Sequence, residues 1–252
     1  MRWTERQRDM LDEMGVRLWF PSPDSLRESA RSLAGPPSER EGETAPATQA
    51  ATIDRRSEVA QMDWPMLRAA VATCTACKLC QGRTNTVFGV GNERAHWMIV
   101  GEAPGEQEDL QGEPFVGKAG QLLDNMLRAI GLTREPGPAE RQVFIANTLK
   151  CRPPRNRNPE PEELAQCEPF LARQVALVQP KIILAMGRFA VQSLLRSEEP
   201  VGRLRGRVHR YQGVPLIVTY HPAYLLRNLE DKAKAWDDLC LALEVAGTSG
   251  AR

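Results

Sequence analysis

Four short apolar segments, each followed by an amphipathic stretch, constrain the fold of this chain more than any other feature. The segments are 97–100, 143–146, 182–186 and 216–219, and each has the length of a buried strand. Helices are predicted at 118–130, 161–178, 187–195 and 229–245. Strands that alternate with helices pair in parallel and are covered on both faces. We therefore predict an α/β fold, namely a three-layer α/β/α domain around a central, mainly parallel four-stranded sheet.

Composition divides the 252 residues into three regions. Residues 1–20 predict a helix and a strand, which we interpret as an N-terminal arm that covers an apolar patch. Residues 21–63 contain no aromatic residue and predict a low-complexity, disordered linker, which leaves 64–247 as the folded domain. No segment predicts a signal peptide or a membrane span, so we expect a cytoplasmic protein that does not bind membranes.

Polar side chains follow each predicted strand directly. The sequence GEAPGEQED follows the first strand, and Asn147 and Lys150 follow the second. Gly187 and Arg188 follow the third strand, and His221 follows the fourth. The carboxyl ends of parallel strands meet at one edge of a sheet, which is where ligands bind in such folds. The sequence therefore predicts one composite site at this edge.

The cysteine spacing predicts a metal site. Cys74, Cys77 and Cys80 form a C-x2-C-x2-C sequence, and Cys151 and Cys167 lie downstream. In a cytosolic protein such a pattern indicates metal binding or catalysis, and four thiolates suit zinc or an iron–sulfur cluster. Spacing alone leaves open which of the first three cysteines is not a ligand.

The groups expected at the strand ends suit a nucleobase. They are two carboxylates, an aromatic ring, an amide and an imidazole: Glu102, Glu108, Phe115, Asn147 and His221. An amide can read a carbonyl and an N–H, a ring can stack on a base, and a carboxylate can orient water or stabilise a cation. Basic runs at 150–157 and 203–210 can neutralise phosphates. Together these features indicate a base in nucleic acid.

Separated motifs in one order resemble the family 4 uracil-DNA glycosylases. They are GEAPGEQED, EPFVGKAGQLLD, NTLKCRPP with a later cysteine, and HPAYLLR. The resemblance implies a monomeric DNA repair enzyme that flips uracil out of single- or double-stranded DNA and hydrolyses the N-glycosidic bond, leaving an abasic site. It also implies a structural [4Fe-4S] cluster, with Cys80 free and four ligands: Cys74, Cys77, Cys151 and Cys167.

The same resemblance implies roles for individual residues. Those implied in catalysis are Glu102, Glu108 and His221, the last as donor to the uracil O2. Those implied in substrate binding are Ala103, Phe115 as the stacking platform, and Asn147 as the reader of the uracil edge. Those implied in DNA binding are Lys150, Arg152, Tyr224, Leu225, Leu226 and Arg227. The N-terminal arm and the linker, residues 1–63, lie outside the resemblance, and we expect them to contact a repair or replication protein.

Two alternatives remain open. A relative that cross-links to uracil-containing DNA would carry a basic, histidine-bearing insertion after the second strand, where this chain reads KCRPPRNRNP. A non-catalytic iron–sulfur or zinc DNA-binding module would need the cysteines and the basic runs, but it would not need a base pocket.

Overall fold

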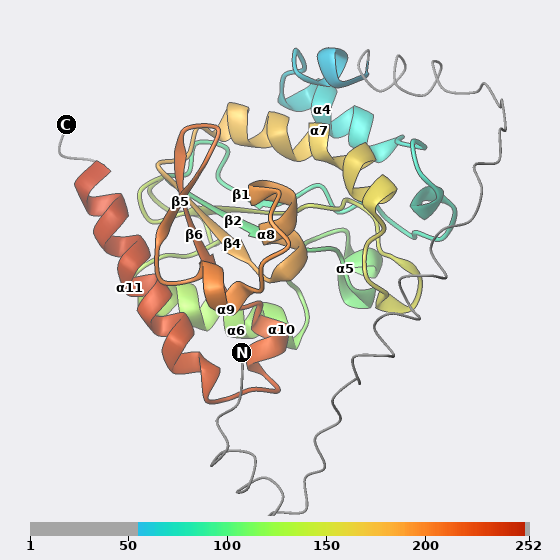
Figure 1. Cartoon of the computed structure of the whole chain (residues 1–252). Helices are drawn as coiled ribbons and strands as arrows, with labels where there is room; N and C mark the ends of the chain where they lie inside the picture. Colours follow the sequence, from blue (N-terminus) through green and yellow to red (C-terminus); the bar gives the residue numbers. More distant parts are fainter. Residues whose placement is uncertain (1–54, 250–252) are drawn as a thin grey trace, which may run out of the picture. The chain divides into compact units, whose positions relative to one another are not determined.

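The computed structural model describes residues 55–249, and the four predicted strands form the centre of its sheet (Figure 1). They are β2 (Trp97–Gly101), β3 (Val143–Asn147), β4 (Ile182–Met186) and β6 (Val214–Thr219). These strands run parallel in the order β3-β2-β4-β6. Their carboxyl ends therefore lie at one edge, as the sequence predicts.

Within residues 55–249, two further strands make the sheet six-stranded, so the predicted number of four is wrong. Strand β1 (Val90–Gly91) pairs antiparallel with β3, and β5 (Val208–Tyr211) pairs antiparallel with β6. The full order is β1-β3-β2-β4-β6-β5. Both added strands lie at the edges and contain exposed or half-buried residues, so neither produces an apolar run in the sequence. The sheet remains mainly parallel.

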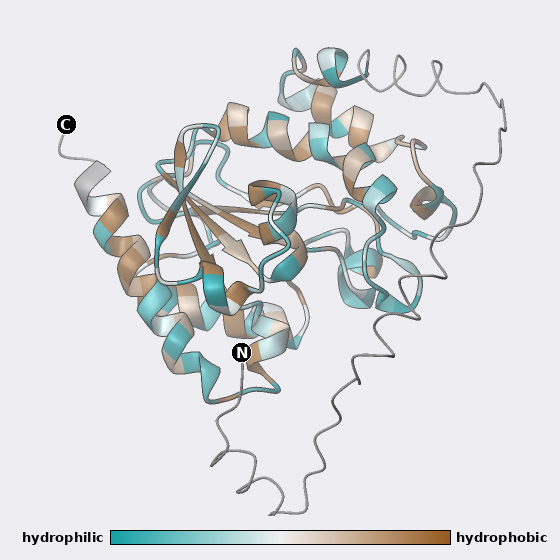
Figure 2. Cartoon of the chain, in the orientation of Figure 1, coloured by the Kyte–Doolittle hydropathy of each residue, from teal (hydrophilic) through white to brown (hydrophobic). Residues whose placement is uncertain are grey.

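Alternate residues of the central strands face two separate helical layers, which confirms the three-layer prediction. Helices α7 (Pro161–Val178) and α8 (Arg188–Leu195) pack on the face that carries Met98 and Val100. Helices α6 (Lys118–Ala129) and α11 (Asp231–Ser249) pack on the opposite face. Figure 2 shows the central strands as the most hydrophobic part of the chain, between these layers.

Short helices connect these main elements. They are α4 (Trp64–Ala72), η1 (Lys78–Gln81), α5 (Glu106–Gln111), η2 (Pro154–Asn156), α9 (Val201–Leu204) and α10 (Pro222–Leu225). The first of them, α4, packs against α7. The sequence predicted a loop where α5 lies. This helix forms because acidic residues occupy its first turn and the Glu108 side chain caps it, and it ends at Gly112, which is left-handed (φ 76°).

The packed domain begins earlier than the predicted boundary at Trp64. Residues 55–59 are helical, and Val59 is buried against Leu67 and Phe170. Arg55 donates to the backbone carbonyl of Gln166 at 2.6 Å. The linker prediction is therefore wrong for residues 55–63, and the predictions for 1–20 and 21–54 lie outside the described residues. Within residues 55–249, no helix is both long and apolar enough to cross a membrane.

Candidate active site

A pocket of about 450 Å³ opens at the carboxyl ends of the central strands. All six residues predicted for catalysis or substrate binding line it: Glu102, Ala103, Glu108, Phe115, Asn147 and His221. They come from the ends of β2, β3 and β6, from α5 and from the loop before α6. The parallel arrangement has therefore brought together groups that are up to 119 residues apart in the chain (102 to 221).

Asn147 ends β3 and presents an unpaired acceptor to the pocket. Its side chain is almost fully buried, and among the described residues its Oδ1 atom has no hydrogen-bond partner. A Cβ atom at Gly101 would lie 2.4 Å from this oxygen, so the glycine at the end of β2 makes room for the amide. A buried acceptor without a donor costs free energy, so the site is suited to a ligand that supplies an N–H.

Phe115 forms an aromatic wall of the pocket. Its backbone is left-handed (φ 56°), and its ring stacks on the His221 ring with centroids 5.3 Å apart. A Cβ atom at Gly120 would lie 1.8 Å from the Phe115 carbonyl oxygen, so this tight turn requires glycine. The ring lines the pocket and is only 5% exposed, because it also packs in the core cluster that contains Leu123 and Ile145.

Glu108 braces the loop that carries Phe115. Its Oε1 atom accepts hydrogen bonds from the backbone N–H groups of Val116 (3.0 Å) and Gly117 (3.3 Å). Its Oε2 atom accepts one from Gly105 at 3.1 Å. Because both oxygens are engaged, this geometry favours a positioning role for Glu108 over the predicted catalytic one.

Glu102 follows β2 and lies against the N-terminus of α8. Its Oε1 atom accepts a hydrogen bond from the backbone N–H of Phe189 at 3.0 Å. Gly187 (φ 91°) allows this approach, because a Cβ atom there would lie 2.5 Å from the same oxygen. Burial raises the pKa of Glu102, while hydrogen bonds from the backbone of Phe189 and Arg188 oppose the rise. The helix N-terminus thus supports a carboxylate in a partly dry site.

His221 follows β6 and caps α10. Its Nδ1 atom accepts a hydrogen bond from the backbone N–H of Ala223 at 3.1 Å, so the ring proton of the neutral form is on Nε2. Burial lowers the pKa of His221 to about 4, although the charge of Glu108 opposes the shift. The imidazole is therefore neutral at pH 7 and has one N–H to donate.

The cysteines meet in a small hollow beside the pocket. Its lining includes five thiols: Cys74, Cys77, Cys80, Cys151 and Cys167. Two guanidinium groups approach them, with Arg83 Nη1 3.2 Å from Cys151 Sγ and Arg55 Nη2 3.4 Å from Cys74 Sγ. Within residues 55–249, no three cysteine, histidine or acidic residues form a group that could hold one metal ion. Because Cys80 shares the hollow, its predicted exclusion from the ligand set stays a prediction.

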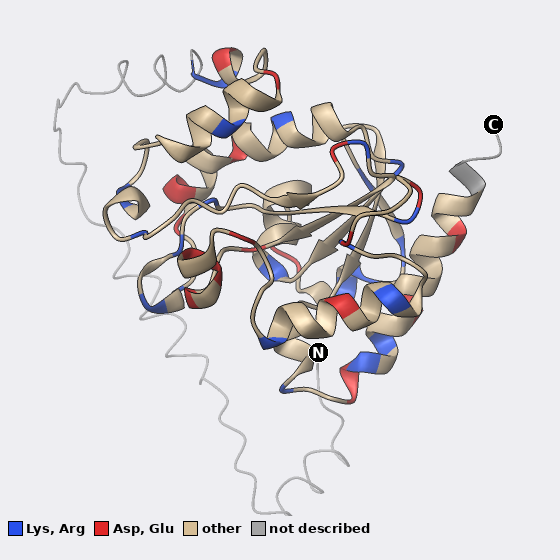
Figure 3. Ribbon diagram, turned by 180° about the vertical axis from the view of Figure 1, so that it is seen from behind, with Lys and Arg blue, Asp and Glu red and all other residues tan. Residues whose placement is uncertain are grey.

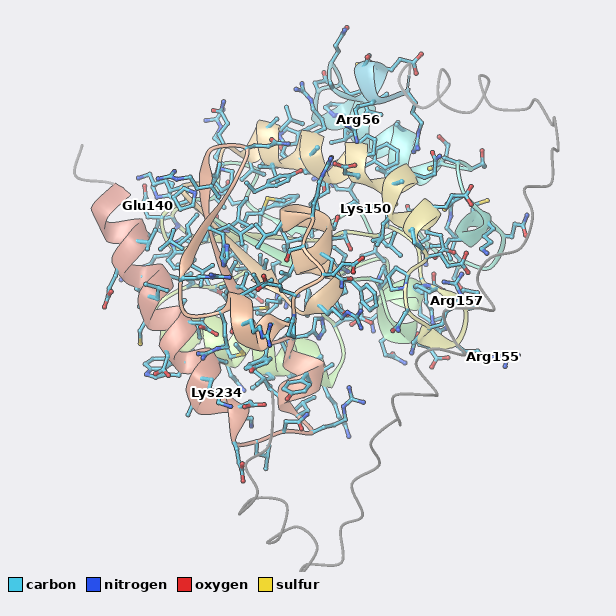
Figure 4. The ribbon with its side chains drawn as sticks, in the orientation of Figure 1. Arg56, Glu140, Lys150, Arg155, Arg157 and Lys234 are labelled. Carbon is cyan, nitrogen blue, oxygen red and sulfur yellow. The ribbon has the colours of Figure 1, made fainter. Side chains whose placement is uncertain are left out.

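Two of the predicted DNA-binding residues are buried, and those predictions are wrong. Lys150 is 1% exposed, and its ammonium donates to Asn147 O and Gln174 Oε1. Figure 4 shows it within the domain, whereas Arg155 lies at the periphery. Leu225 is also 1% exposed and packs towards α6 and α11, so it cannot enter a DNA groove. In both cases tertiary packing buries the side chain, and the local sequence does not indicate this burial.

The remaining predicted DNA-binding residues are more accessible. Leu226 is 41% exposed, and the exposed Arg227 lines the pocket. Tyr224 stacks on Tyr220 and donates to Asp231 at 2.6 Å, so it stabilises the loop. Arg152 donates to Asn156 Oδ1 at 2.8 Å. Contact of these four residues with DNA stays a prediction.

Sequence reasoning missed one wall of the pocket. Residues 153–159 contribute Pro153, Asn156, Arg157, Asn158 and Pro159 to the lining. Arg157 is held by Glu163 at 2.5 Å and by Glu160 at 3.2 Å, and Glu160 in turn binds Lys78 at 2.6 Å. This network connects the pocket wall to the cysteine segment (Figure 4 labels Arg157). The acidic start of the predicted helix at 161–178 was the signal that this arginine run is partly neutralised.

Comparison with known proteins assigns the chain to a family. A model described as the uracil DNA glycosylase superfamily matches residues 88–240. The chain belongs to this superfamily. It is 45% identical to the type-4 uracil-DNA glycosylase of Archaeoglobus fulgidus over 62% of this chain and 79% of the relative. It is 40% identical to the type-4 enzyme of Pyrobaculum aerophilum over 71% of this chain and 93% of the relative.

The chain is also similar to a second type of enzyme in the superfamily, at lower identity. The type-5 uracil-DNA glycosylase of Pyrobaculum aerophilum is 32% identical over 55% of this chain and 66% of the relative. The resemblance to the family 4 enzymes is thus confirmed, since the type-4 proteins match at higher identity and over more of the chain.

Proposed function

We propose that this chain is a uracil-DNA glycosylase that hydrolyses the bond between C1′ and N1 of deoxyuridine in DNA and releases uracil. The observation that carries the proposal is the unpaired Oδ1 atom of Asn147 in the pocket. Uracil offers an N–H at N3 and a carbonyl at O4, which match the oxygen and the NH₂ of one amide. The ring of Phe115 is suited to stack on the base.

The remaining groups suit charge separation in the transition state. As the bond breaks, the sugar becomes cation-like and uracil leaves as an anion. His221 would donate a hydrogen bond from its Nε2 proton to O2, where negative charge develops. Because the imidazole is neutral, it needs no anionic partner in the pocket. Glu102, held at the start of α8, would orient the water or stabilise the sugar cation.

The same pocket would discriminate between pyrimidines. Thymine adds a methyl group at C5, which a closely packed wall excludes. Cytosine presents an amino group where uracil has O4, so a fixed Asn147 NH₂ would face another donor. Loss of one hydrogen bond with a buried polar group left unpaired disfavours the wrong base by orders of magnitude.

We also propose that the cysteine hollow holds a [4Fe-4S] cluster through Cys74, Cys77, Cys151 and Cys167. Its thiols converge from the 74–80 segment, the end of β3 and α7, and the nearby Arg55 and Arg83 would offset thiolate charge. When bound, the cluster would supply a structural link among these segments. The four cysteines would tie the wall at 153–159 to the rest of the pocket.

The proposal is tested by uracil release together with absorbance of the same preparation. Purified protein should release uracil from single- and double-stranded oligonucleotides in EDTA, and thymine should stay in place. It should also be brown, with a broad band near ~400 nm. Failure of a brown, folded protein to release uracil would leave the alternative of a non-catalytic DNA-binding module.

Two pairs of variants sharpen this test. Asn147→Ala should abolish most uracil release, whereas Asn125→Ala, which changes an amide on the far side of α6, should not. Cys151→Ser should lose the absorbance band, and Cys80→Ser should retain it. Retention of the band by Cys151→Ser would refute the proposed ligand set.

A further inference from the structure

Lys150 lies between the base pocket and the cysteine hollow, but it is not exposed in the pocket. It is 1% exposed and lines the cysteine hollow. Its ammonium donates to the backbone carbonyl of Asn147 at 2.8 Å and to Gln174 Oε1 at 2.7 Å. A buried ammonium is costly unless its hydrogen bonds are satisfied, so these two acceptors define where the side chain can lie.

Gln174 completes a buried polar bridge. It is on α7, fully buried, and its Nε2 atom donates to the backbone carbonyl of Phe88 at 2.9 Å. Its two ends are therefore both used, which holds the amide in one orientation. Gln174 is seven residues after Cys167 on the same helix, close to two full turns, so both lie on one side of α7.

The bridge ends on the backbone of the residue that faces the base. Asn147 is the last residue of β3, where the chain leaves the sheet. Beyond it, the N–H groups of Thr148 and Leu149 donate to Gly101 O (3.0 Å) and Glu102 O (3.1 Å). Lys150 supplies a donor for the Asn147 carbonyl itself at this point. The backbone at the end of β3 is thus fixed by the Lys150 ammonium and by the hydrogen bonds to Gly101 and Glu102.

We propose that Lys150, supported by Gln174, is a positioning residue that holds the backbone of Asn147 so that its amide meets the uracil edge. The inference rests on the proposed function. Lys150 does not contact the base and acts only through Asn147. Lys150 also lines the cysteine hollow, so the site that holds the thiols and the residue that reads the base share one buried lysine.

A double-mutant cycle in the full-length protein tests this inference. Single-turnover rates of uracil release are measured for wild type, Lys150→Met, Asn147→Ala and the double variant. Lys150→Met should lower the rate by roughly tenfold to a hundredfold, since displacement of a reading group by about 1 Å has that effect. In the Asn147→Ala background the same change should lower the rate less than about twofold, because coupled residues are not additive.

A control variant separates positioning from a general loss of stability. Gln142 is a buried amide outside the pocket that bonds Asn92 and the Glu135 carbonyl, so Gln142→Leu should lower the melting temperature without changing the rate. Affinity for DNA that contains an abasic site should be unchanged in Lys150→Met. If Lys150→Met does not fold, Gln174→Met takes its place in the double-mutant cycle. Gln174→Met should lower the rate of uracil release by a smaller factor, and this factor should likewise shrink in the Asn147→Ala background.

The outcomes are distinct. A wild-type protein that releases no uracil refutes the proposed function, whatever the variants do. A wild-type protein that releases uracil, with additive effects of Lys150→Met and Asn147→Ala, refutes only the positioning role. An unchanged rate in a folded Lys150→Met variant refutes it as well.

Discussion

Gly101→Ala tests the geometry of the pocket with one methyl group. Gly101 is not among the residues with positive φ, so its backbone accepts alanine and the substitution changes contacts alone. The added Cβ atom would lie 2.4 Å from Asn147 Oδ1 and 2.6 Å from Phe115 Cζ. Ordinary contact begins near 3.4 Å, so the shortfall is about 1 Å for the amide and about 0.8 Å for the ring.

The expected loss follows from this displacement. A shift of about 1 Å in a positioned group lowers the rate by roughly a hundredfold, which corresponds to about 3 kcal/mol in the activation barrier. Crowding of the core should also lower the free energy of unfolding by about 1–3 kcal/mol. The assay is single-turnover release of uracil by excess enzyme, read as alkali-labile cleavage of an oligonucleotide, beside urea unfolding of the same variant.

Gly247→Ala is the matched control. Gly247 is in α11, and a Cβ atom there would meet nothing within 4 Å. Alanine favours a helix over glycine, so this variant should excise uracil at the wild-type rate and be no less stable. A folded Gly101→Ala variant that excises at the wild-type rate would show that the amide and the ring do not need their observed positions, and would refute the reasoning.

Three further predictions follow from charges in the structure. As the pH falls below about 6.5, the unfolded chain protonates at His221 first, because the folded pKa is about 4, so the stability present above pH 6.5 is lost towards pH 4. Between pH 7 and pH 5, the free energy of unfolding in urea should fall by at most about 2 kcal/mol more for wild type than for His221→Gln. Equal decreases would contradict a lowered pKa at His221 in the folded state. Arg205→Met should lower the free energy of unfolding by about 3 kcal/mol, because the fully buried Asp238 loses its arginine partner and keeps the hydrogen bond from the Gly206 N–H. Arg203→Met, at an exposed position of the same basic run, should lower it by less than about 0.5 kcal/mol, and equal unfolding midpoints would refute this. Arg155→Ala should reduce the salt dependence of DNA binding by about one phosphate contact, and an unchanged slope would place the exposed Arg155 away from DNA.

The basic residues show how far local sequence can mislead. Figure 3 shows lysine and arginine spread over the domain. Three acids, in contrast, lie in the first turn of α5. The run at 150–157 looks uniform in sequence. In the structure Lys150 is buried, Arg157 is paired with two glutamates and Arg155 is exposed. The sequence shows which charged residues are present, but burial and ion pairing decide which of their side chains face solvent.

The edges of the fold were predicted less well than its centre. Continuous apolar runs marked the central strands, because a strand covered on both faces needs apolar residues at every position. Strands β1 and β5 are covered less, and α5 is six residues long with mainly polar positions, so their sequences contain no comparable pattern. The helix at residues 55–59 was missed because its packing depends on contacts with α7, more than 100 residues away.

The sequence by itself determined the parallel sheet, the cysteine set and the residue types that reach the carboxyl edge, because periodicity and motif order are local properties. Only the tertiary structure decided which of those residues are hydrogen-bonded, which are unpaired and which are buried. It paired both oxygens of Glu108 with backbone N–H groups and left the Oδ1 atom of Asn147 unpaired. It also turned Lys150 inward, where its ammonium donates to the backbone carbonyl of Asn147. These outcomes depend on distances between segments remote in the chain, which packing alone sets.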